Sequence, residues 1–182
     1  MQNTVYGAAV ENEYLDFDST TTLNTYSDQL VTFNDYEGDP ATQFRYRING
    51  VIDTNQGILQ NVDAIMTACD SWMQYNATLG KWGVVVNKGE AASYSFNDSN
   101  LIGAISIGSI DIAQMPNQIE AKFPDATNRD QSNYVLASVP TFLLYPNEPV
   151  NKLTTNYDLV NDSVQALYLA NRLMEQSRED LL

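Results

Sequence analysis

The sequence contains no histidine and a single cysteine, and these two scarcities exclude much of enzyme chemistry. Without histidine the chain cannot by itself build Ser-His-Asp or Cys-His nucleophile systems, His-ligated zinc sites or histidine proton shuttles. The one thiol, Cys69, lies in an apolar-periodic stretch, which predicts a small buried side chain. Carboxylate, lysine, tyrosine or Ser-Lys chemistry is what remains for an enzyme.

Basic residues are also scarce, with 9 Lys and Arg against 23 Asp and Glu and a net charge of −14. Binding to nucleic acid depends on Lys and Arg displacing counterions from phosphates, so no nucleic-acid binding is expected. The simplest interpretation of the acidity is solubility and suppression of non-specific association.

Long apolar runs are absent as well. The longest, residues 101–113, is too short to cross a bilayer and includes Asp111, so it is interpreted as a strand. The first residues have neither the basic nor the apolar region of a secretory signal. We therefore expect a soluble chain with no membrane segment.

The most regular stretch of the chain predicts a strand followed by a long helix. Residues 43–48 alternate apolar and polar side chains, and Asn49 with Gly50 ends this pattern. Asp53 and Asn55 are of types that cap helix N-termini. Apolar residues at helical spacing then predict a helix over residues 56–74, which at about 1.5 Å per residue would be nearly 30 Å long. These residues are Ile58, Leu59, Val62, Ile65, Met66, Cys69 and Met73.

Further elements are predicted on both sides of this helix. Residues 72–86 predict a β-hairpin with its tip at residues 76–80, and Ile105 to Ile112 predict one or two strands. Residues 118–123 and 133–139 predict strands, and the proline-interrupted residues 140–149 an edge strand or loop. A final helix begins at Asn161 or Asp162, where Asp162 and Gln165 have capping-box spacing. Before residue 42 the chain predicts loops and short strands.

Together these elements predict an α+β fold, in which the strand, long helix and hairpin pack on mixed or antiparallel sheets, with a C-terminal helix. Three ranges are expected. Residues 1–41 form an Asp- and Thr-rich extension or insertion, residues 42–115 a domain with the long helix and hairpin, and residues 116–182 the start of a second domain. The last helix stops on two leucines without a further strand, which suggests a truncated second domain.

Several polar clusters are candidates for sites, but each has a structural interpretation. Asp16 with Asp18, and the group Asn34, Asp35, Glu37 and Asp39, lack the spacing of a helix-loop-helix calcium site and favour Asx turns. Asp125, Asn128, Arg129 and Asp130 predict a loop with an internal ion pair. No glycine-rich phosphate loop is present. No catalytic, cofactor-binding or metal-binding residue is assigned.

The order of motifs from residue 42 to residue 180 resembles the central region of phage tail-tip attachment proteins of the lambda protein J type. In that family a strand ends in a motif like the one around Asn49 and Gly50, then a helix and a W-x-x-Y…G-K-W/Y hairpin follow. The matching residues are Ile58, Leu59, Val62, Ile65, Met66, Trp72, Tyr75, Gly80, Lys81 and Trp82. Downstream matches are Asn117, Phe123, Asp125, Asn128, Gln131, Ala166, Ala170, Arg172 and Leu173.

The resemblance implies a structural, non-enzymatic role. Such proteins form the hub that closes the distal end of the tail tube as a homotrimer, between the distal tail protein and the receptor-binding tip, with tape-measure and other tail-tip components as neighbours. It also implies barrel-like hub domains and a location in the virion at the tail tip.

Two other functions stay open at this point. Trp72, Tyr75, Trp82 and Tyr94 are of a type that stacks on sugars, although a core or interface role is their default. A carbohydrate-binding or carbohydrate-cleaving module of a tail fibre or cell surface is therefore the alternative. A calcium-stabilised adhesin domain is a third.

Overall fold

The computed structural model describes residues 7–34, 39–89, 91, 94–97, 99–103 and 115–179. The helices are α1 (Phe17–Ser27), α2 (Ile58–Ala68) and α3 (Ser163–Glu179), with short 3-10 turns η1 (Asn12–Tyr14), η3 (Ala126–Asn128) and η4 (Thr141–Leu143). The strands are β1 (Leu30–Asn34), β2 (Pro40–Phe44), β3 (Ser71–Asn76), β4 (Lys81–Val86), β5 (Gln118–Asp125), β6 (Gln131–Ser138) and β7 (Lys152–Asn156). The predicted strands between Ile105 and Ile112 lie outside the described residues.

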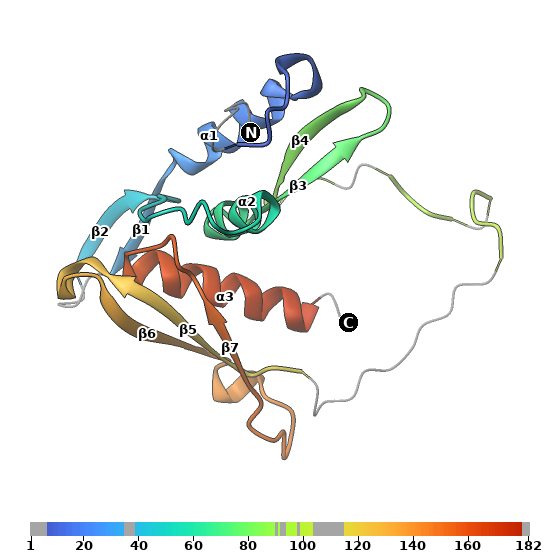
Figure 1. The fold of residues 1–182 in the computed structure, drawn as a ribbon. Helices are drawn as coiled ribbons and strands as arrows, with labels where there is room; N and C mark the ends of the chain where they lie inside the picture. The colour runs from blue at the N-terminus through green and yellow to red at the C-terminus, as the bar shows by residue number, and fades with distance from the viewer. Residues whose placement is uncertain are drawn as a thin grey trace.

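The strands form three small sheets, and the predicted α+β class is confirmed (Figure 1). Strands β1 and β2 pair antiparallel, as do β3 and β4, while the third sheet has the order β6-β5-β7 with β5 and β7 parallel. No closed barrel occurs in the described part of the chain, so the barrel-like form of the domains is not observed. Closure requires the first and last strands of one sheet to pair, and in the three-stranded sheet these are β6 and β7.

Helix α3 lies across the three-stranded sheet and forms the centre of the core with it (Figure 1). Every second residue of β5 points inward, including Ile119, Ala121 and Phe123, which are almost completely buried. Ala166 and Ala170 of α3 have no exposed surface. Because they are small and one turn apart, the helix approaches the sheet closely along this line.

The start of α3 is fixed by Asp162 and Gln165, but not as a reciprocal capping box. Asp162 Oδ1 accepts a hydrogen bond from the Gln165 N–H at 2.9 Å, so the predicted helix start is confirmed. The Gln165 side chain turns into the core instead. Its amide accepts from the Arg47 N–H and donates to the carbonyls of Arg47 and Ala68, at 2.9, 3.1 and 3.0 Å.

The predicted strand at residues 43–48 is wrong in its bounds, since β2 ends at Phe44. The next residues lie outside any strand and bond to separate partners: Arg45 N–H to Gln29 O, Tyr46 N–H to Ser27 O, and Asn49 N–H to Leu159 O. Tyr46 is buried, as the alternation predicts, whereas Phe44 and Ile48 are exposed. An added Cβ at Gly50 would lie 2.7 Å from Leu159 Cδ2 and 3.2 Å from Asp158 O. The glycine therefore permits a close backbone approach between distant segments.

The helix expected over residues 56–74 is real but shorter, because α2 ends at Ala68. Asp70 has φ 46°, a left-handed conformation that stops the helix, and β3 begins at Ser71. The predicted hairpin is confirmed, with Asn76 Oδ1 accepting from the N–H groups of Thr78 and Leu79 in the turn. Met73 continues the helical spacing of apolar residues, but Trp72 and Tyr75 prefer strands. Their pairing with β4 therefore places this segment in the hairpin.

The prediction of loops and short strands before residue 42 missed α1. Asp16 caps this helix by accepting from the N–H groups of Asp18 and Ser19. Four threonine hydroxyls bond to carbonyls four residues earlier, which satisfies them inside a helix they do not favour. They belong to Thr20, Thr21, Thr22 and Thr25. Strand β1 is one of the expected short strands.

The predictions for residues 118–149 agree with the structure, whereas strand β7 was not predicted. Strands β5 and β6 occupy the predicted positions, and residues 140–151 are loop apart from η4. Among the described residues, no helix has the length and apolarity to cross a membrane. The division at residues 41 and 115 stays a prediction; one hydrophobic cluster contains Leu23, Tyr46 and Ile119, which come from all three ranges.

Candidate functional site

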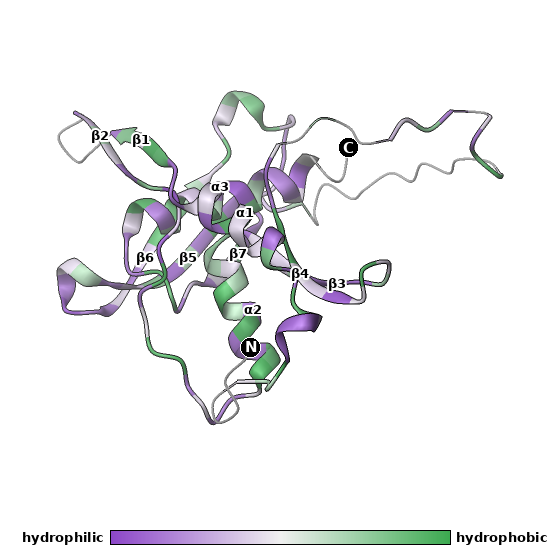
Figure 2. Ribbon diagram, turned by 90° about the horizontal axis from the view of Figure 1, so that it is seen from above, coloured by the Kyte–Doolittle hydropathy of each residue, from purple (hydrophilic) through white to green (hydrophobic). Residues whose placement is uncertain are grey.

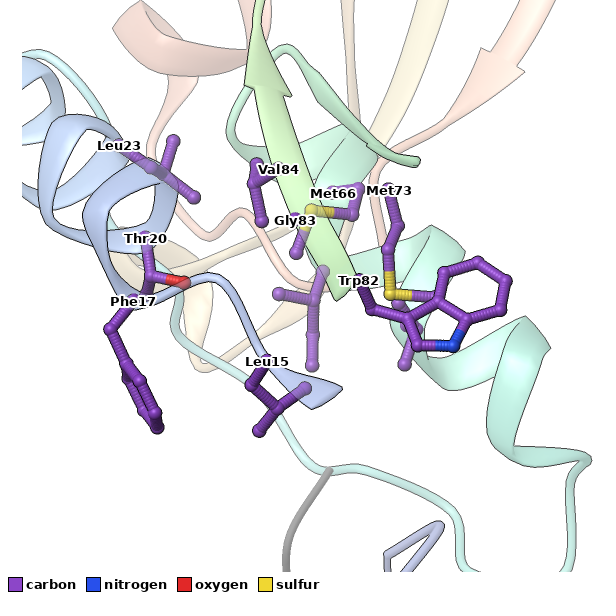
Figure 3. Close-up of a pocket in the computed structure, with 11 residues that line it drawn as sticks. Leu15, Phe17, Thr20, Leu23, Met66, Met73, Trp82, Gly83 and Val84 are labelled. Carbon is purple, nitrogen blue, oxygen red and sulfur yellow. The ribbon is translucent and has the colours of Figure 1, made fainter. Parts of the chain in front are cut away.

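An apolar groove opens between α1, α2 and the β3–β4 hairpin (Figure 3). Its volume is about 500 Å³. Leu15, Phe17, Thr20 and Leu23 line one wall, Val62, Ile65 and Met66 the other, and Met73, Trp82, Gly83 and Val84 the hairpin side. Leu23, Ile65 and Val84 also belong to the core cluster or pack against it. The groove is thus an open extension of the core.

The α1 wall is held on the hairpin by polar contacts at its N-terminal end. The Asp16 N–H donates to Trp82 O at 2.8 Å, and the Val84 N–H donates to Ser19 Oγ at 3.0 Å. A Cβ at Gly83 would lie 2.9 Å from Ser19 Oγ and 3.2 Å from Asp16 Oδ2, so glycine is what lets the helix approach this strand. The apolar side chain of Phe17 is not covered by these polar contacts, and the residue is 51% exposed.

The α2 wall is an amphipathic helix whose apolar side is partly covered. Ala68 is its buried residue, whereas Val62, Ile65 and Met66 are half-buried, and Ile65 packs against the core cluster. In its first turn, Ile58 and Leu59 are 40% and 66% exposed. Figure 2 shows hydrophobic residues, in green, along this helix. A helix of this kind normally buries its stripe, so the stripe marks a surface that another molecule can cover.

The hairpin presents aromatic side chains on both faces. Met73 pairs with Val84 and Tyr75 with Trp82, so these four share the groove face, and Trp72 lies on the opposite face. The Tyr75 and Trp82 ring centroids are 5.1 Å apart. Tyr94 pairs with Phe96 at 5.1 Å in another segment. Of the four aromatic residues considered for sugar stacking, the structure therefore brings together Tyr75 and Trp82 only.

The segments that form the groove walls are acidic. Residues 1–44 contain no lysine or arginine. Next to lining residues in the sequence stand Asp16, Asp18 and Asp63, with Lys81 as the basic counterpart. Asp16 is the α1 cap, whereas Asp18 and Asp63 are exposed and make no ion pair with any described residue. Their charges are therefore available to a binding partner.

A polar network anchors the base of the hairpin to α3. Asp70 accepts from Asn87 Nδ2 at 2.9 Å, from Arg172 Nε at 3.3 Å and from the Tyr46 hydroxyl at 3.5 Å. Burial, followed by the nearby Asp70 charge, raises the pKa of Tyr46 far above its ordinary value and that of Tyr157 to about 12. Both phenols are therefore neutral at physiological pH, and the Tyr46 hydroxyl can donate to Asp70. The network fixes the hairpin relative to α3 and is structural.

The polar cluster at residues 125–130, predicted as a loop with an internal ion pair, is a turn stabilised by hydrogen bonds of Asp125. Asp125 Oδ1 accepts from the Thr127 N–H and hydroxyl, and Oδ2 accepts from Asn133 Nδ2 at 2.7 Å. These hydrogen bonds lower the pKa of Asp125. Arg129 makes no ion pair in this turn, so the expected internal ion pair is wrong; Arg129 and Asp130 instead adopt left-handed conformations. Asp35 and Glu37 lie outside the described residues.

No group of three or more Cys, Asp or Glu side chains suited to a metal ion occurs in the described ranges. Cys69 is 5% exposed, which confirms the expected buried thiol, and burial raises its pKa to about 11. Such a thiol is protonated and unreactive at neutral pH.

Comparison with known proteins adds no assignment: no protein-family model matches the chain, and no curated protein is significantly similar to it.

Proposed function

We propose that this chain is a structural, non-enzymatic component of a bacteriophage or prophage tail tip, part of the hub that closes the distal tail tube and links it to the receptor-binding tip. In this role it works by docking to other tail proteins. The motif series from residue 42 onward supports the tail assignment. The apolar groove and the exposed α2 stripe support a docking function.

The observation that carries the docking function is the uncovered apolar surface around α2. Val51 and Leu59 are 92% and 66% exposed, and Ile52, Ile58 and Phe17 are 46%, 40% and 51% exposed. Soluble monomers leave single apolar side chains in water, but clusters on neighbouring elements mark protein interfaces. A hub subunit has such interfaces with its own copies and with other tail proteins.

The proposed partners follow from this role. The full-length protein forms a homotrimer, and it contacts the distal tail protein and other tail-tip or tape-measure components. The site of action is the virion at the tail tip, after a soluble stage in the host cytoplasm.

Immunogold electron microscopy tests this proposal. An antibody raised against the purified chain is applied to phage particles from a lysate of the strain that carries the gene. Gold at the end of the tail distal to the capsid is expected, and antibody absorbed with excess chain is the control. Gold on the capsid, or particles without label, would refute the tail-tip assignment.

A carbohydrate-binding function is the second candidate, because Tyr75 and Trp82 form an adjoining aromatic pair that is 48% and 38% exposed. Aromatic faces of this kind stack on sugar rings. A glycan array and a reducing-sugar release assay distinguish this function from the tail hub, which predicts no signal in either. Glycan binding that Trp82→Ala abolishes, with Leu79→Ala as the control on the same hairpin, would favour the sugar function.

A further inference from the structure

We infer that the groove between α1, α2 and the β3–β4 hairpin receives a basic amphipathic α-helix from a neighbouring protein. This inference deepens the proposed function and rests on it, because it names the class of partner that one docking surface takes. Two independent features of the groove carry it: the arrangement of its walls and the sign of the charge on the segments that form them.

The walls favour a helix over a strand. Lining residues on α1 and α2 recur at spacings of three or four, so two helical ridges flank the groove with apolar side chains. A third helix laid between them buries a stripe of positions i, i+3, i+4 and i+7, which is the usual mode of helix-in-groove recognition. Met66 and Met73 adapt readily to the shape of such a stripe.

Addition of a partner strand is disfavoured at the same place, because the backbone groups on the nearest sheet edge are already hydrogen-bonded. On the side of β4 that faces α1, Trp82 O accepts from the Asp16 N–H and the Val84 N–H donates to Ser19 Oγ. A partner strand would have to displace both hydrogen bonds. A helix satisfies its own backbone groups and needs only the apolar walls.

The charge of the segments that form the walls selects the charge of the partner. Asp18 and Asp63 adjoin lining residues of opposite walls in the sequence, are exposed and have no ion-pair partner among the described residues. Glu11 and Glu13 add two more exposed carboxylates just before the α1 wall. Lysine or arginine flanking the apolar stripe of a partner would meet this charge, while an acidic helix, or a second copy of this acidic chain, would be repelled.

Fluorescence anisotropy with labelled synthetic peptides tests the inference. One probe has leucine at positions i, i+3, i+4 and i+7 and lysine on its polar face; the second carries glutamate in place of lysine; the third is a scrambled leucine-lysine sequence. The lysine helix is expected to bind at least about tenfold more tightly than either other peptide, and its binding to weaken as salt rises.

Variants locate the binding on the molecule. Phe17→Ser and Val62→Ser, from opposite walls, each weaken binding about tenfold. Leu79→Ser is the control, since it removes an exposed leucine of the β3–β4 turn that does not line the groove. The double variant Asp18→Asn and Asp63→Asn reduces the preference for lysine over glutamate. Circular dichroism and melting temperature confirm that each variant is folded.

Several results would overturn the inference: no binding of the lysine helix, equal binding of the lysine and glutamate or scrambled peptides, or a Leu79→Ser effect equal to those of the wall variants. Concentration-dependent self-association that Phe17→Ser abolishes, seen by sedimentation velocity, would assign the groove to a second copy and also overturn it. If the lysine helix does not bind but gold labels the tail tip, only the groove inference is refuted. Specific peptide binding without gold at the tail tip refutes the tail-tip assignment instead.

Discussion

Gln165 is the side chain whose replacement tests the packing of the core most directly. Its buried amide joins three segments, because it bonds to both backbone groups of Arg47 and to the Ala68 carbonyl at the end of α2. Only 2% of the residue is exposed. Leucine has nearly the same volume, so Gln165→Leu removes the three hydrogen bonds without opening a cavity.

The expected cost comes from the backbone groups that lose their partner. The Ala68 carbonyl is buried, so it suffers a full desolvation penalty of about 1–3 kcal/mol when left unpaired. Arg47 is exposed, so water replaces part of the hydrogen bonding that its N–H and carbonyl groups lose. The apolar leucine offsets a fraction of the total. We therefore expect a loss of about 3 kcal/mol in the free energy of unfolding, which lowers the melting temperature by about 6–12 °C in a chain of this size.

Thermal and urea denaturation, followed by circular dichroism, measure this loss. Gln176→Leu is the matched control: it makes the same change on the same helix, where the side chain has no hydrogen bond to described residues and lines a surface pocket. That variant is expected to change stability by less than about 0.5 kcal/mol. Equal melting temperatures for the two variants would show that the Gln165 contacts do not join α3 to α2 and the Arg47 segment.

Two further predictions concern other contacts. Hydrogen bonds, first from Arg178 and then from the Tyr145 N–H and Asn117, lower the pKa of Glu148 from 4.5 to about 2, so its stabilisation is complete above about pH 4.5 and is lost as the pH falls toward 2. Glu148→Gln therefore lowers the melting temperature at pH 7, and the difference from the wild type narrows on acidification; a constant difference contradicts this. Gly83→Ala forces a Cβ against Ser19 Oγ and costs about 1–3 kcal/mol, whereas Gly89→Ala, with no atom within 4 Å, is nearly neutral. Urea denaturation compares the two, and equal stabilities would rule out the close α1 contact.

Elements with a strong local pattern were predictable from the sequence. The hairpin follows from its flanking apolar segments and polar tip, and α3 from its Asp162 cap and apolar spacing. The helical spacing of the apolar residues predicted that α2 exists, but it did not predict where the helix ends. Met73 continues the helical spacing, and only pairing with Val84 shows that it belongs to a strand.

Helix α1 shows why other elements escape such an analysis. Its threonines have low helix propensity, and the helix forms because Asp16 caps it and because it packs against Gly83 of β4, more than sixty residues away. In the same way, the alternation at Tyr46 predicts extended backbone but not its partners, which are Ser27, Gln165 and Leu159 at distant places in the chain.

By itself, the sequence determined that the chain lacks histidine chemistry, that it is acidic, and that α2 is an amphipathic helix followed by an aromatic hairpin. Only the tertiary structure decided that Val62, Ile65 and Met66 of α2 line an open groove, while Ala68 at its end enters the core. The physical reason is that periodicity encodes which face of a helix is apolar, while the covering of that face depends on contacts between distant residues. Here α3 and the three-stranded sheet form the centre of the core, and the N-terminal end of α1 attaches to β4 through polar contacts, so the part of the chain that the structure describes leaves the groove open.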